Sequence, residues 1–351
     1  MALNSIVNMI RRLFSAFYPP KPGINYKKTI GILAGDGIGP EVMSSAVSVL
    51  QHVNAPLNFE YIEDFDVNDD TVIERMKSFD AIMKGTIQHL VAEGAGSPNM
   101  VLRKKLDVFA NVVHAYSLEG VETKYKDVDI ITVRENLEGE YSGLEHEIYP
   151  GVVESIKVIT RPASLRIAEY AFQLAHLNNR RKVTAVHKAN IMKLVDGEFL
   201  KATREVAQKY PTIKYEEMIV DNTSMQMASN PNQFDVLVLP NLYGAIILNI
   251  AAYMVGGPGV SSGVNLSDKV AIFEQGTRHT GGKVAGKNLA NPTAMMLSSV
   301  MMLRHLQLPH FADRIQEGVL KTLKEGRVRT ADIGGSATTT KFTEEVINNI
   351  S

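Results

Sequence analysis

Residues 29–41 read TIGILAGDGIGPE, and this stretch indicates the kind of fold that the rest of the chain repeats. Its first six residues are mostly aliphatic, as expected of a short buried strand. The glycine-rich turn that follows leads into a predicted helix, with Pro40 in its first turn. A strand that passes through a tight turn into a helix is the repeating unit of α/β proteins.

The same alternation continues along the chain. Apolar runs typical of short buried strands occupy residues 29–34, 128–133, 182–187, 235–239 and 270–273. Ser164 is predicted to cap a helix with one apolar face, formed by Leu165, Ala168, Phe172 and Ala175. Pro292 is predicted in the first turn of another helix, whose apolar residues are interpreted as core: Met295, Met296, Leu297, Met301 and Met302. The sequence therefore predicts an α/β fold.

Composition excludes several classes of protein. The 351 residues carry a net charge of −1, so no overall field attracts nucleic acid or an anionic membrane. The chain contains no cysteine, which excludes a disulfide framework, a thiolate nucleophile and a cysteine-based zinc site. Residues 236–267 are uncharged, but proline and glycine interrupt them too often for a membrane span. A buried strand, a turn and a buried helix are predicted there instead.

The amino-terminal segment has the pattern of a targeting sequence. No acidic residue precedes Asp36, and Arg11 and Arg12 interrupt an apolar series at helical spacing: Leu3, Ile6, Ile10, Leu13 and Phe17. Two prolines at positions 19 and 20 end any helix. We interpret residues 1–27 as a mitochondrial presequence, which predicts a location in the mitochondrial matrix. A disordered tail with chance periodicity is the alternative.

The glycine segment 35–41 has two interpretations. Glycines at the start of a helix allow a phosphate to approach the backbone, as in dinucleotide-binding proteins. The spacing is not that of the G-x-G-x-x-G fingerprint, however, and no acidic residue follows on a second strand at the expected distance. A tight strand–helix turn without a ligand explains the pattern at least as well.

Two polar loops have residues suited to a ligand with several carboxylates. Ser97, Asn99 and Arg103 lie within one loop-to-helix stretch, and Arg134 follows a predicted strand. Arginine pairs with a carboxylate through two parallel hydrogen bonds, and a hydroxyl and an amide fix its orientation. A solvated helix start is the alternative for the first loop. Lys188 directly follows another strand, where partial desolvation can lower a lysine pKa enough for acid–base chemistry.

These segments, taken in order, resemble one family. From about Thr29 to the carboxyl terminus the sequence is similar to the β-decarboxylating dehydrogenases, which oxidise isocitrate, isopropylmalate or homoisocitrate with NAD or NADP. The resemblance includes the closing segment DIGGSATT at residues 332–339. Residues 186–194 (VHKANIMKL) and 291–299 (NPTAMMLSS) are similar to the regulatory kind of mitochondrial NAD-dependent isocitrate dehydrogenase subunit.

The resemblance implies a fold that is not the Rossmann fold. A large α/β domain is expected from residues 28–117 and 255–351, with a smaller domain from residues 118–254. The smaller domain is expected to include a clasp at about residues 140–162. In the family, the clasp pairs two subunits, and the active site is shared across their interface. A catalytic isocitrate dehydrogenase subunit is therefore the expected partner.

The catalytic metal site of the family is incomplete in this sequence. Family enzymes hold Mg²⁺ or Mn²⁺ with two aspartates spaced i, i+4 on a helix after a Tyr-Gly turn, and with a third aspartate elsewhere. After Tyr243-Gly244 the matching positions are Ala245 and Asn249, and only Asp221 remains. Hard divalent cations require oxygen ligands, chiefly carboxylates, so this chain should bind the metal poorly. Catalysis by this chain alone is therefore not expected.

Other departures point to regulatory ligands. Val113 replaces one substrate arginine, and the adenine-binding loop has gained Arg278, His279 and Lys283. In similar regulatory subunits the nucleotide pocket binds AMP or ADP, and the former substrate pocket binds citrate. The resemblance therefore implies two sites: a nucleotide site at Arg278, His279, Lys283 and Asn288, and a citrate site at Ser97, Asn99, Arg103 and Arg134. Sequence drift after loss of function is the alternative for the loop.

Three residues retained from the family's catalytic set require another explanation. In the family, the lysine and the third aspartate reach into the neighbouring subunit, so Lys188 and Asp221 are expected to complete the partner's site, where Asp221 would be a metal ligand. Tyr141 stands at the proton-donor position. The predicted function is that of a regulatory subunit of NAD-dependent isocitrate dehydrogenase, with NAD and Mg²⁺ or Mn²⁺ bound in the holoenzyme. The alternatives are a catalytically competent subunit with a displaced metal site and, less favoured, a purely structural subunit.

Overall fold

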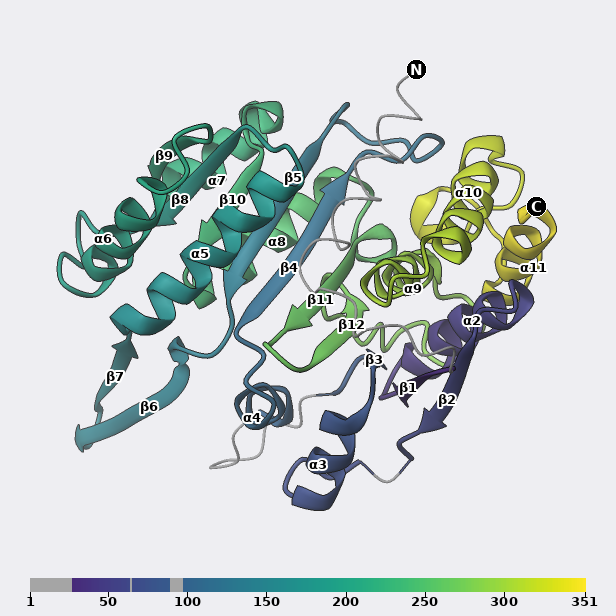
Figure 1. The fold of residues 1–351 in the computed structure, drawn as a ribbon, viewed down its shortest axis with the longest axis horizontal. Coiled ribbons are helices and arrows are strands. Elements are labelled where there is room, and N and C mark those ends of the chain that lie inside the picture. The colour runs from purple at the N-terminus through teal and green to yellow at the C-terminus, as the bar shows by residue number, and fades with distance from the viewer. Residues whose placement is uncertain (1–26, 64, 89–96) are drawn as a thin grey trace.

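The computed structural model describes residues 27–63, 65–88 and 97–351, and Figure 1 shows their arrangement. All but the last residue of the predicted presequence therefore lie outside the described residues. Within them, no helix is long and apolar enough to cross a membrane.

Ten strands form one sheet in the order β2-β1-β3-β12-β11-β4-β5-β10-β8-β9. The strands are β1 (Lys28–Leu33), β2 (Leu57–Tyr61), β3 (Ala81–Lys84), β4 (Ala110–Tyr116), β5 (Asp129–Glu135), β8 (Lys182–His187), β9 (Lys214–Ile219), β10 (Val236–Leu239), β11 (Ser262–Leu266) and β12 (Ala271–Gln275). Neighbours pair in parallel except at β12–β11, β11–β4 and β4–β5. Two parallel halves therefore run in opposite directions on either side of β11 and β4. This mixed α/β sheet confirms the predicted fold class.

The predicted domain division passes between β4 and β5. Strands β2, β1, β3, β12, β11 and β4 come from residues 28–117 and 255–351, and strands β5, β10, β8 and β9 come from residues 118–254. The sheet continues across this boundary, because β4 and β5 pair along their whole length. The division into two domains stays a prediction.

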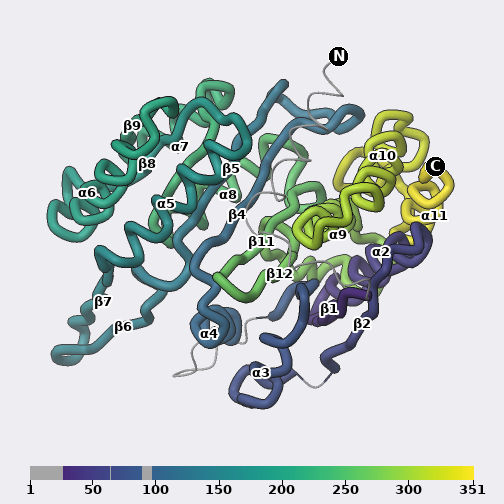
Figure 2. Tube along the Cα trace, in the orientation of Figure 1, coloured from purple at the N-terminus to yellow at the C-terminus, as the bar shows by residue number. Residues whose placement is uncertain are grey.

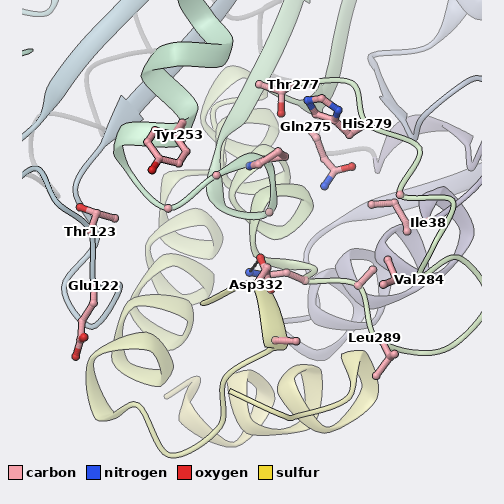
Figure 3. Close-up of a pocket in the computed structure, with 18 of the residues that line it drawn as sticks. Ile38, Glu122, Thr123, Tyr253, Gln275, Thr277, His279, Val284, Leu289 and Asp332 are labelled. Atoms are coloured by element: carbon pink, nitrogen blue, oxygen red, sulfur yellow. Dashed lines mark hydrogen bonds between the residues drawn. The ribbon is translucent and has the colours of Figure 1, made fainter. Parts of the chain in front are cut away.

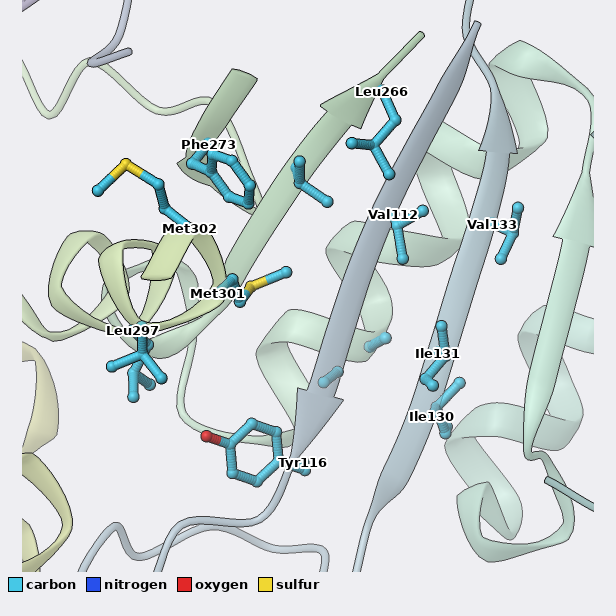
Figure 4. Close-up of a cluster of buried hydrophobic side chains, with 14 of the residues drawn as sticks. Val112, Tyr116, Ile130, Ile131, Val133, Leu266, Phe273, Leu297, Met301 and Met302 are labelled. Carbon is cyan, nitrogen blue, oxygen red and sulfur yellow. The ribbon is translucent and has the colours of Figure 1, made fainter. Parts of the chain in front are cut away.

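Helices cover both faces of the sheet (Figure 1). They are α2 (Gly39–His52), α3 (Asp70–Ser78), α4 (Pro98–Lys105), α5 (Arg161–Leu177), α6 (Val195–Ala207), α7 (Val220–Ser229), α8 (Asn241–Met254), α9 (Thr293–His305), α10 (Pro309–Glu325) and α11 (Thr339–Asn349). Helix α9 lies against β11 and β12, and Met302 lies beside Phe273 (Figure 4). The methionines of α9 are buried, as predicted for core residues.

The structure corrects two local predictions. Thr160, not Ser164, caps α5: its hydroxyl accepts a hydrogen bond from the backbone N–H of Ala163, whereas Ser164 lies buried inside the helix. The backbone of Thr160 is extended, and Pro162 fits the first turn that follows. The uncharged stretch 236–267 forms β10, α8, a 3₁₀ turn at Pro258–Val260 and then β11, a strand that was not predicted. Its helix also has an exposed face with Ile246 and Tyr253.

A two-stranded hairpin, β6 (Gly139–Tyr149) and β7 (Val152–Val158), extends away from the main sheet (Figure 2). Several of its apolar side chains are exposed: Leu144, Ile148, Tyr149, Val153 and Ile156. The hairpin occupies the residues of the predicted clasp, and its role in pairing subunits stays a prediction.

Candidate functional site

Arg103 is one of two buried arginines near the carboxyl end of β5. It lies in the last turn of α4, a helix that begins at Pro98 after the buried Ser97. The residue is 5% exposed, and one terminal nitrogen, Nη2, has no hydrogen-bond partner among the described residues. Asn99, one turn earlier, donates a long hydrogen bond (3.4 Å) to the carbonyl of Ile87.

Arg134 is the second buried arginine and ends the apolar run of β5. Its side chain is fully buried, and its Nε and Nη2 atoms donate to Oδ1 of Asn241 at 3.1 and 2.7 Å. The guanidinium also lies 5.1 Å from the centre of the Tyr141 ring. Its third nitrogen, Nη1, has no hydrogen-bond partner in the described part of the chain.

The two arginines interact unfavourably with one another. Burial lowers the pKa of both groups, and the nearby charge of Arg103 contributes further to lowering the pKa of Arg134 to about 10. Both remain protonated at neutral pH, so two cations share a desolvated space with one unpaired nitrogen each. Glu274 and Glu135 favour the charged form of Arg103, and Tyr141 and Glu135 favour that of Arg134, but burial outweighs them. An anion with several oxygens would offset the remaining cost.

A buried polar network supports Arg103 and was not predicted. Oδ1 of Asn265 accepts hydrogen bonds from Asn111 and Asn136, and its amide donates to Glu274 at 2.6 Å. Glu274 pairs with Lys84 at 2.5 Å in the interior. Burial opposes ionisation of Glu274, but Lys84 and Arg103 together keep its pKa below the usual range. These residues come from β3, β4, β11, β12 and the residue after β5, so no local pattern in the sequence shows that they meet.

The two positions predicted to match the metal ligands of the family, 245 and 249, lie on α8. Ala245 offers no ligand, and Asn249 uses its amide within the chain. Its Nδ2 donates to the carbonyl of Ala245 at 2.7 Å, and its Oδ1 lies 3.2 Å from Nε2 of His279. No cluster of three histidine or acidic side chains is arranged for a metal ion in the part of the chain that the structure describes.

Lys188 and Asp221 form a separate ion pair at the molecular surface. Nζ of Lys188 lies 2.5 Å from Oδ1 of Asp221, and their side chains are 27% and 68% exposed. Hydrogen bonding to Lys188 keeps the pKa of Asp221 below its ordinary value. Lys188 follows β8, and Asp221 lies in the first turn of α7, so the carboxyl ends of two neighbouring strands bring them together.

A cavity of about 630 Å³ lies between α8, the loop after β12 and the connection between β4 and β5. Figure 3 shows Glu122, Thr123 and Tyr253 on one side and Ile38, Val284 and Leu289 on the other, with Asp332 between them. His279 and Thr277 also line the cavity. The hydroxyl of Thr277 is buried and has no hydrogen-bond partner among the described residues.

The glycine turn after β1 forms part of this wall. Gly37 has a φ of +61°, and a side chain there would collide with the carbonyl of Thr280 at 2.2 Å. The backbone N–H of Ile38 donates to that same carbonyl at 3.0 Å. The glycine therefore allows the loop after β12 to approach the turn closely, a packing role that the sequence motif did not reveal.

The other predicted nucleotide residues lie on the same loop but do not line the cavity. Arg278 is partly buried, and Lys283 is exposed. Asn288 accepts hydrogen bonds from the backbone and hydroxyl of Thr340 at the start of α11. Val113 is buried in β4, and a side chain at Gly276 would approach it within 2.8 Å. The assignment of these residues to ligand binding stays a prediction.

Comparison with known proteins gives a consistent picture. Residues 29–350 match the family described as isocitrate/isopropylmalate dehydrogenase. The chain is 49% identical over 342 residues to Arabidopsis thaliana "Isocitrate dehydrogenase [NAD] regulatory subunit 1, mitochondrial", which covers 95% of this chain and 92% of the relative. It is 49% identical over 347 residues to the Homo sapiens "Isocitrate dehydrogenase [NAD] subunit gamma, mitochondrial", covering 97% and 88%.

A solved structure is also similar. The isocitrate dehydrogenase from Methylococcus capsulatus superposes with a TM-score of 0.87 at 37% sequence identity. The match covers 92% of this chain and 99% of that one. The arrangement of both halves of the sheet is therefore shared with that protein.

Replacing Gly244 by alanine should disturb the position of Arg134. A Cβ at Gly244 would lie 2.4 Å from Cγ of Arg134, so we expect Gly244→Ala to destabilise the chain by about 1–3 kcal/mol. Urea unfolding measures the change. Gly197→Ala in α6 is the matched control, because its Cβ would meet nothing within 4 Å; it should stabilise by about 0.5–1 kcal/mol. Equal effects of the two substitutions would contradict the close contact.

Proposed function

This chain belongs to the isocitrate/isopropylmalate dehydrogenase family, and we propose that within it the chain serves as a regulatory subunit of a mitochondrial NAD-dependent isocitrate dehydrogenase. In this role it binds citrate and an adenine nucleotide, AMP or ADP, and completes the active site of a catalytic partner subunit. The relatives reported above are named as mitochondrial regulatory or gamma subunits, which supports the subunit role. We place the assembly in the mitochondrial matrix.

The observation that carries the citrate site is the pair of buried arginines. Arg103 and Arg134 each keep one unpaired guanidinium nitrogen, and each is more costly to bury because the other is near. A tricarboxylate supplies several oxygens and enough negative charge to satisfy both nitrogens. Ser97 and Asn99, at the start of α4, add a hydroxyl and an amide for orientation.

The donor set on α8 does not fit a divalent cation. A methyl group at Ala245 has no lone pair, and the Asn249 amide already bonds within the chain. Mg²⁺ and Mn²⁺ prefer carboxylate oxygens, so we assign metal and NAD chemistry to the partner subunit. The isolated chain should therefore turn over no isocitrate even with excess Mn²⁺. Turnover at a rate typical of the family would instead favour the alternative, a catalytically competent subunit.

The exposed ion pair supports donation to a partner. Lys188 and Asp221 pair with one another rather than with either buried arginine, and both side chains reach solvent. Residues that act in their own chain's site are ordinarily desolvated within it. We propose that this pair enters the neighbour's active site, where Asp221 ligates the metal and Lys188 takes part in proton transfer, and we leave the role of Tyr141 open.

The cavity between α8 and the loop after β12 suits a mononucleotide. Its apolar side chains, Ile38, Val284 and Leu289, could cover an adenine ring, and the unpaired Thr277 hydroxyl offers a polar contact. Arg278, His279 and Lys283 make the adjoining loop cationic, as a phosphate requires, and Asn288 holds the end of that loop against α11. The cavity would therefore bind AMP or ADP.

Loss of either buried arginine should weaken citrate binding. Arg103→Gln or Arg134→Gln removes a charged hydrogen-bond donor, and we expect the dissociation constant for citrate to rise about 10- to 100-fold. Isothermal titration calorimetry measures it. Arg204→Gln, which removes an exposed arginine paired with Glu217, should leave the affinity unchanged. Unchanged citrate affinity in both Arg103→Gln and Arg134→Gln would rule out the proposed citrate site.

Loss of the exposed ion pair should impair the partner. In a reconstituted pair with a catalytic subunit, Lys188→Ala or Asp221→Ala should reduce kcat by roughly 10²- to 10⁴-fold, the contribution of a positioned proton-transfer group. Steady-state assays of NADH formation test this. Lys201→Ala, at an exposed lysine of α6, is the control. Normal turnover by both mutant pairs would show that the residues are not donated.

Nucleotide binding should depend on the cationic loop. We expect Arg278→Gln combined with Lys283→Gln to weaken AMP binding about tenfold or more, because two phosphate partners are lost. Calorimetric titration with AMP gives the comparison, and Lys269→Gln, an exposed lysine before β12, is the control. If AMP does not bind the unaltered chain, loop drift becomes the better explanation.

A further inference from the structure

A buried acidic residue connects Lys188 to the interior of the chain. Asp196, in the first turn of α6, is fully buried. One of its oxygens accepts a hydrogen bond from the backbone N–H of Lys188 at 2.6 Å, and the other lies 2.7 Å from Nζ of Lys157. The amino-terminal turn of α6 adds the favourable field of the helix dipole to the same carboxylate.

Lys157 extends this network to three other elements. It lies in β7 of the hairpin, and its Nζ atom donates to the hydroxyl of Tyr243 at 3.1 Å and lies 4.3 Å from the centre of that ring. Glu140 of β6 approaches the same ammonium group at 3.2 Å. The hairpin, α6 and the start of α8 are therefore joined at one ammonium group.

The charges of this network are buried and paired. Burial alone would lower the pKa of Lys157, yet hydrogen bonds to Asp196 and Tyr243 outweigh it and keep that pKa above the usual value. Burial raises the pKa of Tyr243 to about 12, so the phenol keeps its proton. Removing one partner would leave the others unsatisfied, which strongly disfavours rearrangement.

The backbone and the side chain of Lys188 have different partners. The backbone N–H is held by the buried Asp196, whereas the ammonium group lies at the surface beside Asp221. An anchored backbone fixes the point from which the side chain leaves the chain toward the surface. Neither the sequence motif nor the ion pair with Asp221 provides such an anchor, since Asp221 is itself exposed.

We infer that Asp196 and Lys157 are positioning residues, which hold Lys188 in the orientation needed to enter the partner's active site. The inference rests on the proposed donation of Lys188. Asp196 acts through the backbone of Lys188, and Lys157 acts through Asp196. Lys157 also contacts Glu140, next to Tyr141 on β6, and Tyr243 on α8. The network therefore connects Lys188 to both of these elements.

The test uses the reconstituted pair of this chain with a catalytic subunit. Asp196→Asn keeps the shape of the side chain but removes its charge, and Lys157→Met removes the ammonium group. We expect each to lower kcat roughly 10- to 100-fold with little change in the KM for isocitrate, because a displaced reacting group mainly affects the chemical step. Citrate affinity should not change, since neither residue contacts Arg103 or Arg134.

Three further variants make the result decisive. Lys157→Arg keeps a cation in the network and should recover most of the lost kcat. Lys182→Met breaks another ion pair at the start of β8, with Glu216, and should leave kcat unchanged. Lys188→Ala is the reference, because its effect establishes the donation itself. If Asp196→Asn prevents assembly, the positioning role is tested by the kcat of Lys157→Met against that of Lys157→Arg.

The outcomes distinguish the inference from the proposed function. Full kcat in Asp196→Asn and Lys157→Met, beside a large loss in Lys188→Ala, overturns the positioning role and leaves donation intact. A loss of kcat that is accompanied by an equal loss of citrate affinity and of assembly shows a merely structural network, and also overturns it. Full kcat in Lys188→Ala contradicts the proposed function first.

Discussion

Two guanidinium groups buried near one another are the constraint on which the proposed site depends. Each raises the cost of burying the other, and the surrounding chain offsets that cost only in part. Asn241 accepts two hydrogen bonds from Arg134, and the ion pair of Lys84 with Glu274 places a carboxylate near Arg103. One guanidinium nitrogen of each arginine has no hydrogen-bond partner among the described residues, so the pair is suited to bind an anion.

Helix α8 contributes to the proposed anion site through its contacts with Arg134. Its first turn holds Arg134 through Asn241, and Gly244 leaves room for the arginine side chain. Further along the same helix, Ala245 and Asn249 carry no charge. With two buried arginines and no carboxylate at positions 245 and 249, this end of α8 favours an anion over a cation. The same helix therefore retains the machinery for binding carboxylates and lacks the ligands for a dication.

At the surface that carries Lys188 and Asp221, the exposed ion pair is weak and the strong interactions are buried. The ion pair is weak because solvent screens charges that lie at the surface. The strong interactions lie beneath it, where Asp196 and Lys157 are paired in the interior. In the proposed role, the buried Asp196–Lys157 pair holds the backbone of Lys188, so that its exposed side chain can contact a neighbouring subunit. The hairpin that bears Lys157 also extends from the sheet with exposed apolar side chains, as a surface between subunits would.

The sequence by itself determined the alternation of strands and helices, the buried methionines of α9 and the absence of carboxylates at positions 245 and 249, because these are properties of local pattern and of residue identity. It placed the helix cap at Ser164 instead of Thr160, because neighbouring polar residues offer similar capping patterns. It also predicted β1, β5, β8, β10 and β12 of the large sheet but not β2, β3, β4, β9 and β11. The tertiary structure alone decided which polar residues meet: Lys84 with Glu274, Asp196 with Lys157, and Arg103 beside Arg134. Those partners lie on different strands and helices, and sheet order and register bring them together. Periodicity along the chain carries no information about such contacts.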